Sequence, residues 1–182
     1  MSDLFRVDGT THLLHSYVFD VESRRVVHNG GAFTRDVATH KGAVAILVVN
    51  NDGEIGLIRQ YRATFDTYTW EIPAGTRDVE GEDPLDTAKR ELKEEMGATA
   101  REWNLLGRFM NSPGWTDQVM TIFEARSIEL GTRNTAGPEE ASSTIHWLSP
   151  LDLRTTLRNE PAVDSTMMVA LNRVFGTYFD GI

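Results

Sequence analysis

The sequence contains no cysteine. Disulfide bonds, thiolate nucleophiles and thiolate metal sites are therefore excluded by counting. Long apolar runs are also missing, because the longest ones, at 43–49 and 167–171, fall well short of the roughly 20 residues that cross a bilayer. Residues 1–10 lack the apolar core of a signal peptide. We therefore expect a cytoplasmic protein that does not associate with membranes.

Basic residues are few compared with acidic ones. Lys and Arg number 18 against 27 for Asp and Glu, which gives a net charge of −9. This charge argues against a broad basic surface, so we expect no nucleic-acid partner and favour a metal cation. At 182 residues the chain fits one main domain with a small addition, and its 40% hydrophobic and 25% charged content is ordinary for a folded protein.

Patterns of apolar residues predict β-strands over much of the chain. Residues 11–38 alternate loosely between apolar and polar, as in a small β-meander. The β-branched run at 43–49 predicts a buried strand, and Asn51-Asp52-Gly53 predicts a hairpin turn that pairs it with 54–62. Further strands are expected at 68–72, 103–110, 119–125 and 144–148, with a polar loop at 131–143 and a C-terminal helix from about Ser165.

One helix has clear predicted ends. Asp83 can cap its start, Pro84 suits the first helical position, and Gly97 follows the last good helical residue. The spacing therefore predicts a helix over Pro84–Met96.

This helix carries three acids on one edge. Glu91 and Glu95 are one turn apart, and Glu94 lies beside them. Like charges at this spacing destabilise a helix, and a divalent cation would offset them, since Mg²⁺ prefers carboxylate and carbonyl oxygens. Taken alone, the cluster could instead be a solvated acidic face with Arg90 and Lys93 as local partners.

The residues before the helix make the acids part of a longer motif. Glu71-Ile72-Pro73-Ala74-Gly75 leads to Glu82 and then to the helix, and the whole resembles the Nudix hydrolase signature, G-x5-E-x7-R-E-U-x-E-E-x-G-U with U apolar. Its fixed positions match Gly75, Glu82, Arg90, Glu91, Leu92, Glu94, Glu95, Gly97 and Ala98. Six residues rather than five separate Gly75 from Glu82, a change that a loop can absorb without moving the helical acids.

The resemblance implies an α/β fold, the Nudix α/β/α sandwich, carrying a small N-terminal β-meander. We expect residues 1–40 to form strands used for dimerisation and residues 41–182 to form the hydrolase domain. The N-terminal segment has too few apolar residues for its own core, and unpaired strand edges would be exposed. The sequence therefore predicts a homodimer, which the resemblance also implies.

The resemblance further implies metal-dependent hydrolysis of a nucleoside diphosphate linked to another group, with Mg²⁺ or Mn²⁺ as cofactor. The implied metal ligands are Glu91, Glu94, Glu95 and the carbonyl of Ala74. Glu91 and Glu95 are thereby also catalytic. Arg90, grouped with them, is expected to pair with Glu82 and to orient the site.

Other phrases resemble the ADP-ribose pyrophosphatase subgroup. They are Ile58-Arg59-Gln60-Tyr61-Arg62, Trp70-Glu71-Ile72-Pro73-Ala74-Gly75 and Ser112-Pro113-Gly114. The implied substrate is a nucleoside diphosphate sugar, foremost ADP-ribose, cleaved to AMP and ribose 5-phosphate. Gln118 stands where the subgroup often has an acid, so another nucleotide sugar or a dinucleoside polyphosphate stays open. A nucleotide-sensing module without catalysis is the alternative from another class.

The remaining site residues follow from the same resemblance. Arg35 and Arg62 are expected to bind substrate phosphates, and Pro113 to line the substrate site. A surface position is the alternative for each arginine, and an ordinary turn is the alternative for Pro113. The catalytic base is expected on the loop at 131–143, where Glu139 and Glu140 are the available acids, and Glu140 is preferred.

Overall fold

A computed structural model describes residues 4–134 and 137–182 of the chain. It consists of two compact units, each of which is described separately. The N-terminal unit contains the described residues up to Gly42 together with Met110–Val119. The larger unit contains Ala43–Phe109 and Met120–Ile182.

The N-terminal unit contains a three-stranded antiparallel meander of β1 (Arg6–His15), β2 (Asp20–His28) and β3 (Gly31–Thr39). The predicted meander is present, but it starts earlier than residue 11, because Arg6 already pairs with Val27. Asn29 and Gly30 both have positive φ, the conformation that tight β-hairpins require. All of β1 is exposed.

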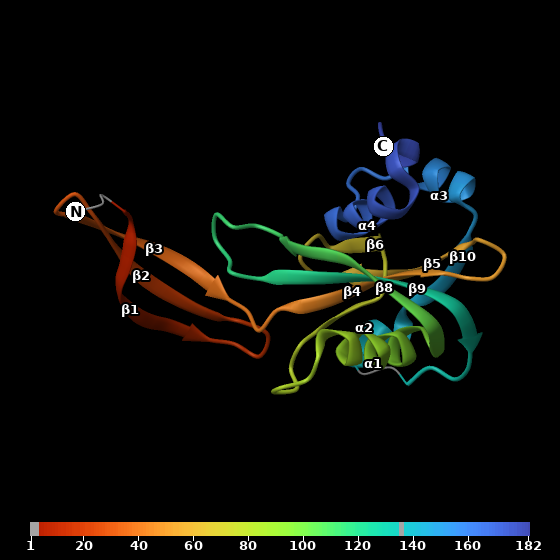
Figure 1. Ribbon diagram of the computed structural model, residues 1–182, viewed down its shortest axis with the longest axis horizontal. Coiled ribbons are helices and arrows are strands. Elements are labelled where there is room, and N and C mark those ends of the chain that lie inside the picture. The colour runs from red at the N-terminus through yellow and green to blue at the C-terminus, as the bar shows by residue number, and fades with distance from the viewer. Residues whose placement is uncertain (1–3, 135–136) are drawn as a thin grey trace. The chain divides into compact units, whose positions relative to one another are not determined.

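The larger unit is built on one mixed sheet (Figure 1). Its strand order is β10-β5-β4-β9-β8. Strands β4 and β9 pair in parallel, whereas β5 pairs antiparallel with both β4 and β10. Two short strands lie off this path, with β6 on β5 and β7 on β4. The bounds are β4 Ala43–Val49, β5 Ile55–Arg62, β6 Thr67–Glu71, β7 Ala74–Thr76, β8 Ala98–Met110, β9 Val119–Leu130 and β10 Thr144–Leu148.

The predicted β4–β5 hairpin is correct at its turn but short. The two strands pair only at Val48–Gly56 and Val49–Ile55. Earlier in β4 the neighbouring place is taken by β7, whose Ala74 pairs with Ala45. The insertion of β7 brings the predicted site segment onto the central strand.

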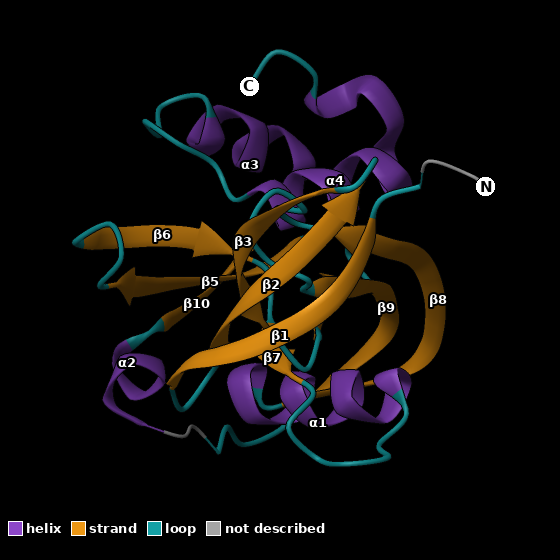
Figure 2. Ribbon diagram, turned by 90° about the vertical axis from the view of Figure 1, so that its left-hand side faces the viewer, coloured by secondary structure: helices purple, strands orange, loops and turns teal. Residues whose placement is uncertain are grey.

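Helices cover both faces of this sheet, which confirms the predicted α/β/α sandwich (Figures 1 and 2). The helix α1 (Pro84–Met96) has the predicted bounds, with Asp83 as N-cap and Gly97 at φ 63° as C-cap. Alternate β4 residues Val44, Ile46 and Val48 pack in the core on the α1 side, and Ala45 and Leu47 pack with the C-terminal helices. The β4 run is thus continuous because both faces are buried.

Two helices differ from expectation. The short α2 (Gly137–Ser142) lies within the predicted loop, and α3 (Pro150–Leu157) was not predicted. The sequence does contain a helix-start signal for α3, because Ser149 caps the helix and Pro150 occupies its first turn. The C-terminal helix α4 (Ser165–Phe175) begins where predicted, and a 3₁₀ turn, Gly176–Phe179, follows it. Among the described residues, no helix is long and apolar enough to cross a membrane.

Candidate active site

The acidic edge of α1 packs directly on β7. Glu91 and Glu95 are buried, with 9% and 5% of their surfaces exposed. The backbone N–H of Ala74 donates a hydrogen bond of 2.8 Å to Glu95 Oε2. A Cβ placed on Gly75 would lie 1.9 Å from Glu91 Cδ. The glycine therefore leaves the space that the Glu91 carboxylate occupies.

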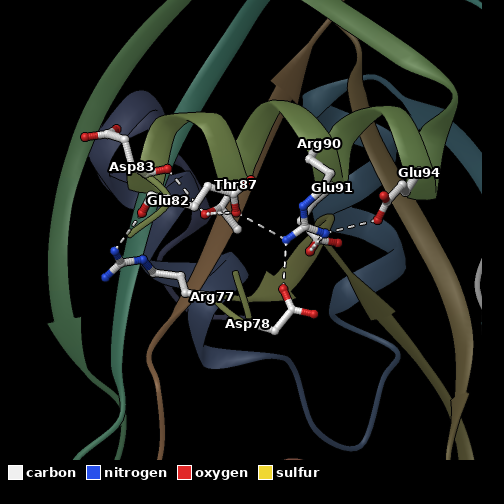
Figure 3. Close-up of polar contacts among 8 residues, drawn as sticks. All are labelled: Arg77, Asp78, Glu82, Asp83, Thr87, Arg90, Glu91 and Glu94. Carbon is white, nitrogen blue, oxygen red and sulfur yellow. Dashed lines mark hydrogen bonds and ion pairs between the residues drawn. The ribbon is translucent and has the colours of Figure 1, made fainter. Parts of the chain in front are cut away.

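Arg90 lies among four carboxylates (Figure 3). Its Nη1 is 2.8 Å from Glu91 Oε1 and 3.2 Å from Glu94 Oε2. Its Nη2 is 3.1 Å from Asp78 Oδ1 and 3.4 Å from Glu82 Oε2. The expected Arg90–Glu82 ion pair is present, and Asp78, which the sequence analysis did not consider, is a further partner. Arg90 thus joins the loop after β7 to the helix.

Glu82 strengthens the same connection. Thr87 Oγ1 donates to Glu82 Oε2 at 2.8 Å, and Arg77 Nη2 donates to the Glu82 carbonyl at 3.0 Å (Figure 3). Asp83 accepts from the Leu85 N–H and so begins the helix. The loop between Gly75 and α1 is therefore fixed through both side-chain and backbone contacts. It contains one residue more than the signature, and α1 still begins at Pro84 as predicted.

Burial changes the protonation of the two inner acids. Desolvation raises the pKa of Glu91 to about 7, although the charge of Arg90 opposes the rise. Desolvation likewise raises the pKa of Glu95 to about 8, against the Ala74 hydrogen bond and with help from the charges of Glu91 and Glu140. Desolvation favours the neutral form of a carboxyl, whereas a nearby cation would favour its ionised form.

Carboxylate oxygens of this kind fit a hard divalent cation. Within residues 4–134 and 137–182, however, no group of three His, Cys, Asp or Glu side chains is arranged to hold a metal ion. The reason is local: Arg90 occupies the position between Glu91 and Glu94 and supplies the counter-charge that the sequence analysis assigned to a metal. Glu95 has no such cation among the described residues, and its buried carboxylate is the donor that best fits a metal.

Arg62 is bound by a carboxylate of its own sheet. Its Nε and Nη2 donate to the two oxygens of Glu71 at 2.8 and 2.5 Å. Glu71 also accepts from Thr69 Oγ1 at 2.6 Å and Gln60 Nε2 at 3.2 Å. Burial raises the pKa of Glu71, but the charge and hydrogen bonds of Arg62, together with the hydrogen bonds from Thr69 and Gln60, hold that pKa below its usual range.

A small cavity of about 170 Å³ lies beside these residues. Asp164 lines it while capping α4 through the N–H groups of Thr166 and Met167. Its pKa is raised by burial. The lining residues are Arg62, Glu71, Ile72, Ala74, Met120, Asp164 and Thr166. Ala74 belongs both to this cavity and to the contact with Glu95.

The predicted base lies on α2. The charge of Glu140 contributes to the raised pKa of Glu95, whereas Glu139 acts on Arg62, whose pKa is raised mainly by Glu71. The charges of the two neighbouring acids thus act on different residues of the site, and it is the charge of Glu140 that acts on Glu95 of α1.

Arg35 and Pro113 belong to the N-terminal unit. Arg35 is exposed on β3, with its guanidinium 4.5 Å from the Phe33 ring centroid. Pro113 lies in a turn in which the Ser112 carbonyl accepts from the Trp115 and Thr116 N–H groups. The acids of α1 belong to the larger unit, so the substrate roles of Arg35 and Pro113 stay predictions.

Three acids at this site, Glu71, Asp78 and Asp164, were not assigned a role from the sequence. Glu71 was quoted in a motif but given no role, and its pairing with Arg62 depends on the β5–β6 register. Asp78 and Asp164 had no spacing signal, because a loop and a helix cap bring them to the site.

The chain is similar in sequence to known proteins. A family model described as the NUDIX domain matches residues 39–168. An ADP-ribose pyrophosphatase of Mycobacterium tuberculosis is 42% identical over 118 residues, which are 65% of this chain and 57% of that protein. An ADP-ribose pyrophosphatase of Bacillus subtilis is 40% identical over 114 residues, 63% of this chain and 59% of that protein.

A solved structure, described as the crystal structure of an ADP compounds hydrolase, shares the fold. It superposes with a TM-score of 0.79 at 24% identity and covers 94% of this chain and 92% of its own. The chain spans less than two thirds of the length of the two curated relatives. Since the family model matches well over half of the chain, including the whole strand, loop and helix motif, this protein belongs to the Nudix family.

Proposed function

We propose that this chain is a metal-dependent pyrophosphohydrolase that cleaves ADP-ribose to AMP and ribose 5-phosphate. The observation that carries the proposal is the pair of buried carboxylates, Glu91 and Glu95, packed on Ala74 and Gly75. Burying two acids destabilises a fold unless a cation balances them in the working state. A module that only binds nucleotides would have no need for a metal-binding pair of acids.

Glu91, Glu94, Glu95 and the Ala74 carbonyl would hold Mg²⁺ or Mn²⁺. When bound, such an ion bridges pyrophosphate oxygens and offsets the charge that grows on the leaving oxygen. Arg90 orients Glu91 and Glu94 through its ion pairs and holds the loop that ends at Glu82. Its place among carboxylates supports a positioning role.

Glu140 is the proposed general base. Its carboxylate would accept a proton from the attacking water, and its charge already acts on Glu95. Arg62 presents a guanidinium whose Nε and Nη2 are bound to Glu71, which leaves Nη1 for a phosphate oxygen. Glu71 fixes the orientation of Arg62 for that contact.

The choice of ADP-ribose is supported by the names of the two curated relatives and by the Arg59-Gln60-Tyr61-Arg62 phrase. Gln118 hydrogen-bonds to Asn111 rather than offering a carboxylate. Another nucleotide sugar or a dinucleoside polyphosphate is therefore the competing substrate. A Nudix module that senses nucleotides without cleaving them is the competing function.

The proposed homodimer uses the N-terminal sheet. Large apolar side chains are exposed on this sheet and in the residues next to its strands, namely Leu4, Phe5, Val7, Leu13, Leu14, Phe19 and Phe33. A second copy of the chain would cover such a surface.

A substrate panel tests the proposal. ADP-ribose, ADP-glucose, GDP-mannose, NADH and diadenosine polyphosphates are compared by kcat/KM with Mg²⁺, with Mn²⁺ and with a chelator. We expect ADP-ribose to lead by about ten-fold or more, which needs only ~1.4 kcal/mol of differential transition-state stabilisation. The chelator should abolish turnover, and restored metal should recover it.

The outcomes separate the parts of the proposal. Undiminished activity in chelator would refute the metal mechanism. A different leading substrate would refute only ADP-ribose, and tight nucleotide binding without turnover of any substrate would favour the sensing module.

A further inference from the structure

The segment before α2 is bound to the end of the acidic helix. The Gly131 N–H donates to the Gly97 carbonyl at 2.6 Å, and the Asn134 N–H donates to the Glu94 carbonyl at 3.3 Å. A Cβ on Gly97 would lie 2.6 Å from the Arg133 nitrogen, so the two backbones are in close contact. Residues 131–134 are therefore attached to the C-terminus of α1.

Arg133 extends from this segment to the far end of α2. Its Nη1 donates to the Ser143 carbonyl at 3.1 Å. Its Nη2 donates to Ser143 Oγ at 2.8 Å and to the Glu140 carbonyl at 3.3 Å. A cation at these carbonyls also interacts favourably with the end of a helix.

The Glu140 carbonyl is the centre of this arrangement. Besides the Arg133 guanidinium, it accepts from the Ser143 N–H at 3.1 Å and from Ser143 Oγ at 2.8 Å. Ser143 is buried, with 6% of its surface exposed, so water competes poorly for these bonds. Three donors thus fix the backbone of Glu140, whose charge acts on Glu95 of α1.

We propose that Arg133 is a positioning residue that holds Glu140 at a fixed place relative to the acids of α1. The inference rests on the proposed function, in which Glu140 is the base. Arg133 connects α1 and α2, because its neighbours Gly131 and Asn134 are hydrogen-bonded to the end of α1 and its guanidinium is hydrogen-bonded to the end of α2. The general base must lie within hydrogen-bond reach of its water, so a displaced Glu140 slows chemistry rather than substrate binding.

Kinetics of single variants give the first test. Arg133→Ala should lower kcat by roughly 10- to 100-fold, the scale of about 1 Å of misplacement, with KM for ADP-ribose nearly unchanged. Arg133→Lys, which keeps the charge but not the planar fork, should recover part of kcat. Ser143→Ala should lower kcat in the same direction. Arg101→Ala is the matched control, because Arg101 is a surface arginine paired with Glu129.

A double-mutant cycle separates positioning from general stabilisation of the fold. In the Glu140→Gln background, Arg133→Ala should lower kcat by less than about two-fold, because residues that act as a unit are not additive. An equal fold-loss in both backgrounds, or no loss in either, would overturn the inference. If Arg133→Ala does not fold, Ser143→Ala carries the same cycle.

The cycle also distinguishes this inference from the proposed function. Full activity of Glu140→Gln would refute Glu140 as the base and the Arg133 role with it. Impaired Glu140→Gln with fully active Arg133 and Ser143 variants would refute the Arg133 role alone.

Discussion

Glu95 illustrates at the residue scale how this site differs from an ordinary helical surface. Its carboxyl is buried, accepts one backbone hydrogen bond from Ala74 and has no ion-pairing cation among the described residues. Glu91, four positions earlier, has Arg90 as counter-charge. The desolvation of a buried carboxylate therefore destabilises the fold mainly at Glu95, and a bound metal ion would offset this destabilisation.

The stability of the metal-free protein should therefore fall as pH rises. The folded-state pKa values of Glu91 and Glu95, about 7 and about 8, lie above the ordinary value of 4.5. Between pH 4.5 and 8 the folded state thus holds more protons than the unfolded state, and the free energy of unfolding decreases with pH. Urea denaturation in chelator at several pH values measures this, and Glu95→Gln should flatten the decline.

A control variant and the addition of Mg²⁺ show whether the pH dependence comes from Glu95. Glu80→Gln changes an exposed glutamate and should leave the slope unchanged. Mg²⁺ at pH 8 should restore stability to the wild type more than to Glu95→Gln. A wild-type slope identical to that of Glu95→Gln would contradict the assignment of the titration to this buried acid.

Sequence spacing could predict which site residues share the helix, but not which residues from distant segments contact each other. Glu91, Glu94 and Glu95 share an edge because helical geometry alone puts them there. Arg62 was predicted as a phosphate ligand, but its partner Glu71 follows from strand register, which a short apolar pattern does not specify. The local counter-charge of Arg90, which was weighed only as an alternative, is present.

At the scale of elements, the site depends on the close approach of β7 to α1. Gly75 permits it, because no side chain separates the strand from the Glu91 carboxylate. The loop then returns to the helix through Glu82 and Arg90. Strand, loop and helix thus act as one unit whose spacing is set by a missing Cβ.

Gly75→Ala should consequently impair catalysis more than stability. The added methyl displaces the Glu91 carboxylate, which is the end of a flexible side chain and can rotate away. We expect kcat to fall roughly 10- to 100-fold, as for comparable misplacement of a catalytic group. Steady-state kinetics and a thermal melt measure the two effects.

Gly9→Ala is the control for this substitution. A Cβ on Gly9 meets its nearest atom at an ordinary 3.9 Å, and no positive φ is required there. If Gly75→Ala retained wild-type kcat, or lost activity only in proportion to unfolding, the proposed role of the glycine contact would be wrong.

Element predictions succeeded where a pattern was local and failed where pairing was non-local. The bounds of α1 follow from Asp83, Pro84 and Gly97. The sequence could not predict that β7, rather than β5, pairs with the first part of β4. The strand β7 is only three residues long and gives no clear pattern of its own. The helix α2 was missed because Gly137 and Pro138 also signal a loop.

At the scale of the whole molecule, the two units differ in how their sheets are buried. The larger unit has helices on both faces of its sheet, whereas β1 of the N-terminal unit is exposed at every position. Exposed Leu14 and Val7 on that strand are unusual for a chain that functions alone.

We expect a homodimer at micromolar concentration in sedimentation equilibrium. Leu14→Lys should shift the distribution toward monomer, because a buried lysine at an apolar interface is unfavourable. Thr10→Lys, on the same exposed strand, is the matched control. A wild-type monomer at that concentration would count directly against the dimer.

The parallel pairing of β4 with β9 has a consequence for how the chain is made. Ala43 pairs with Met120, so the central strand waits for its partner until most of the protein has left the ribosome. Contacts so distant in sequence form late in folding. Until then the apolar β4 run offers an unpaired edge, the feature that promotes aggregation of nascent chains. Early chaperone engagement of the nascent chain is therefore expected to govern its yield more than the stability of the finished fold.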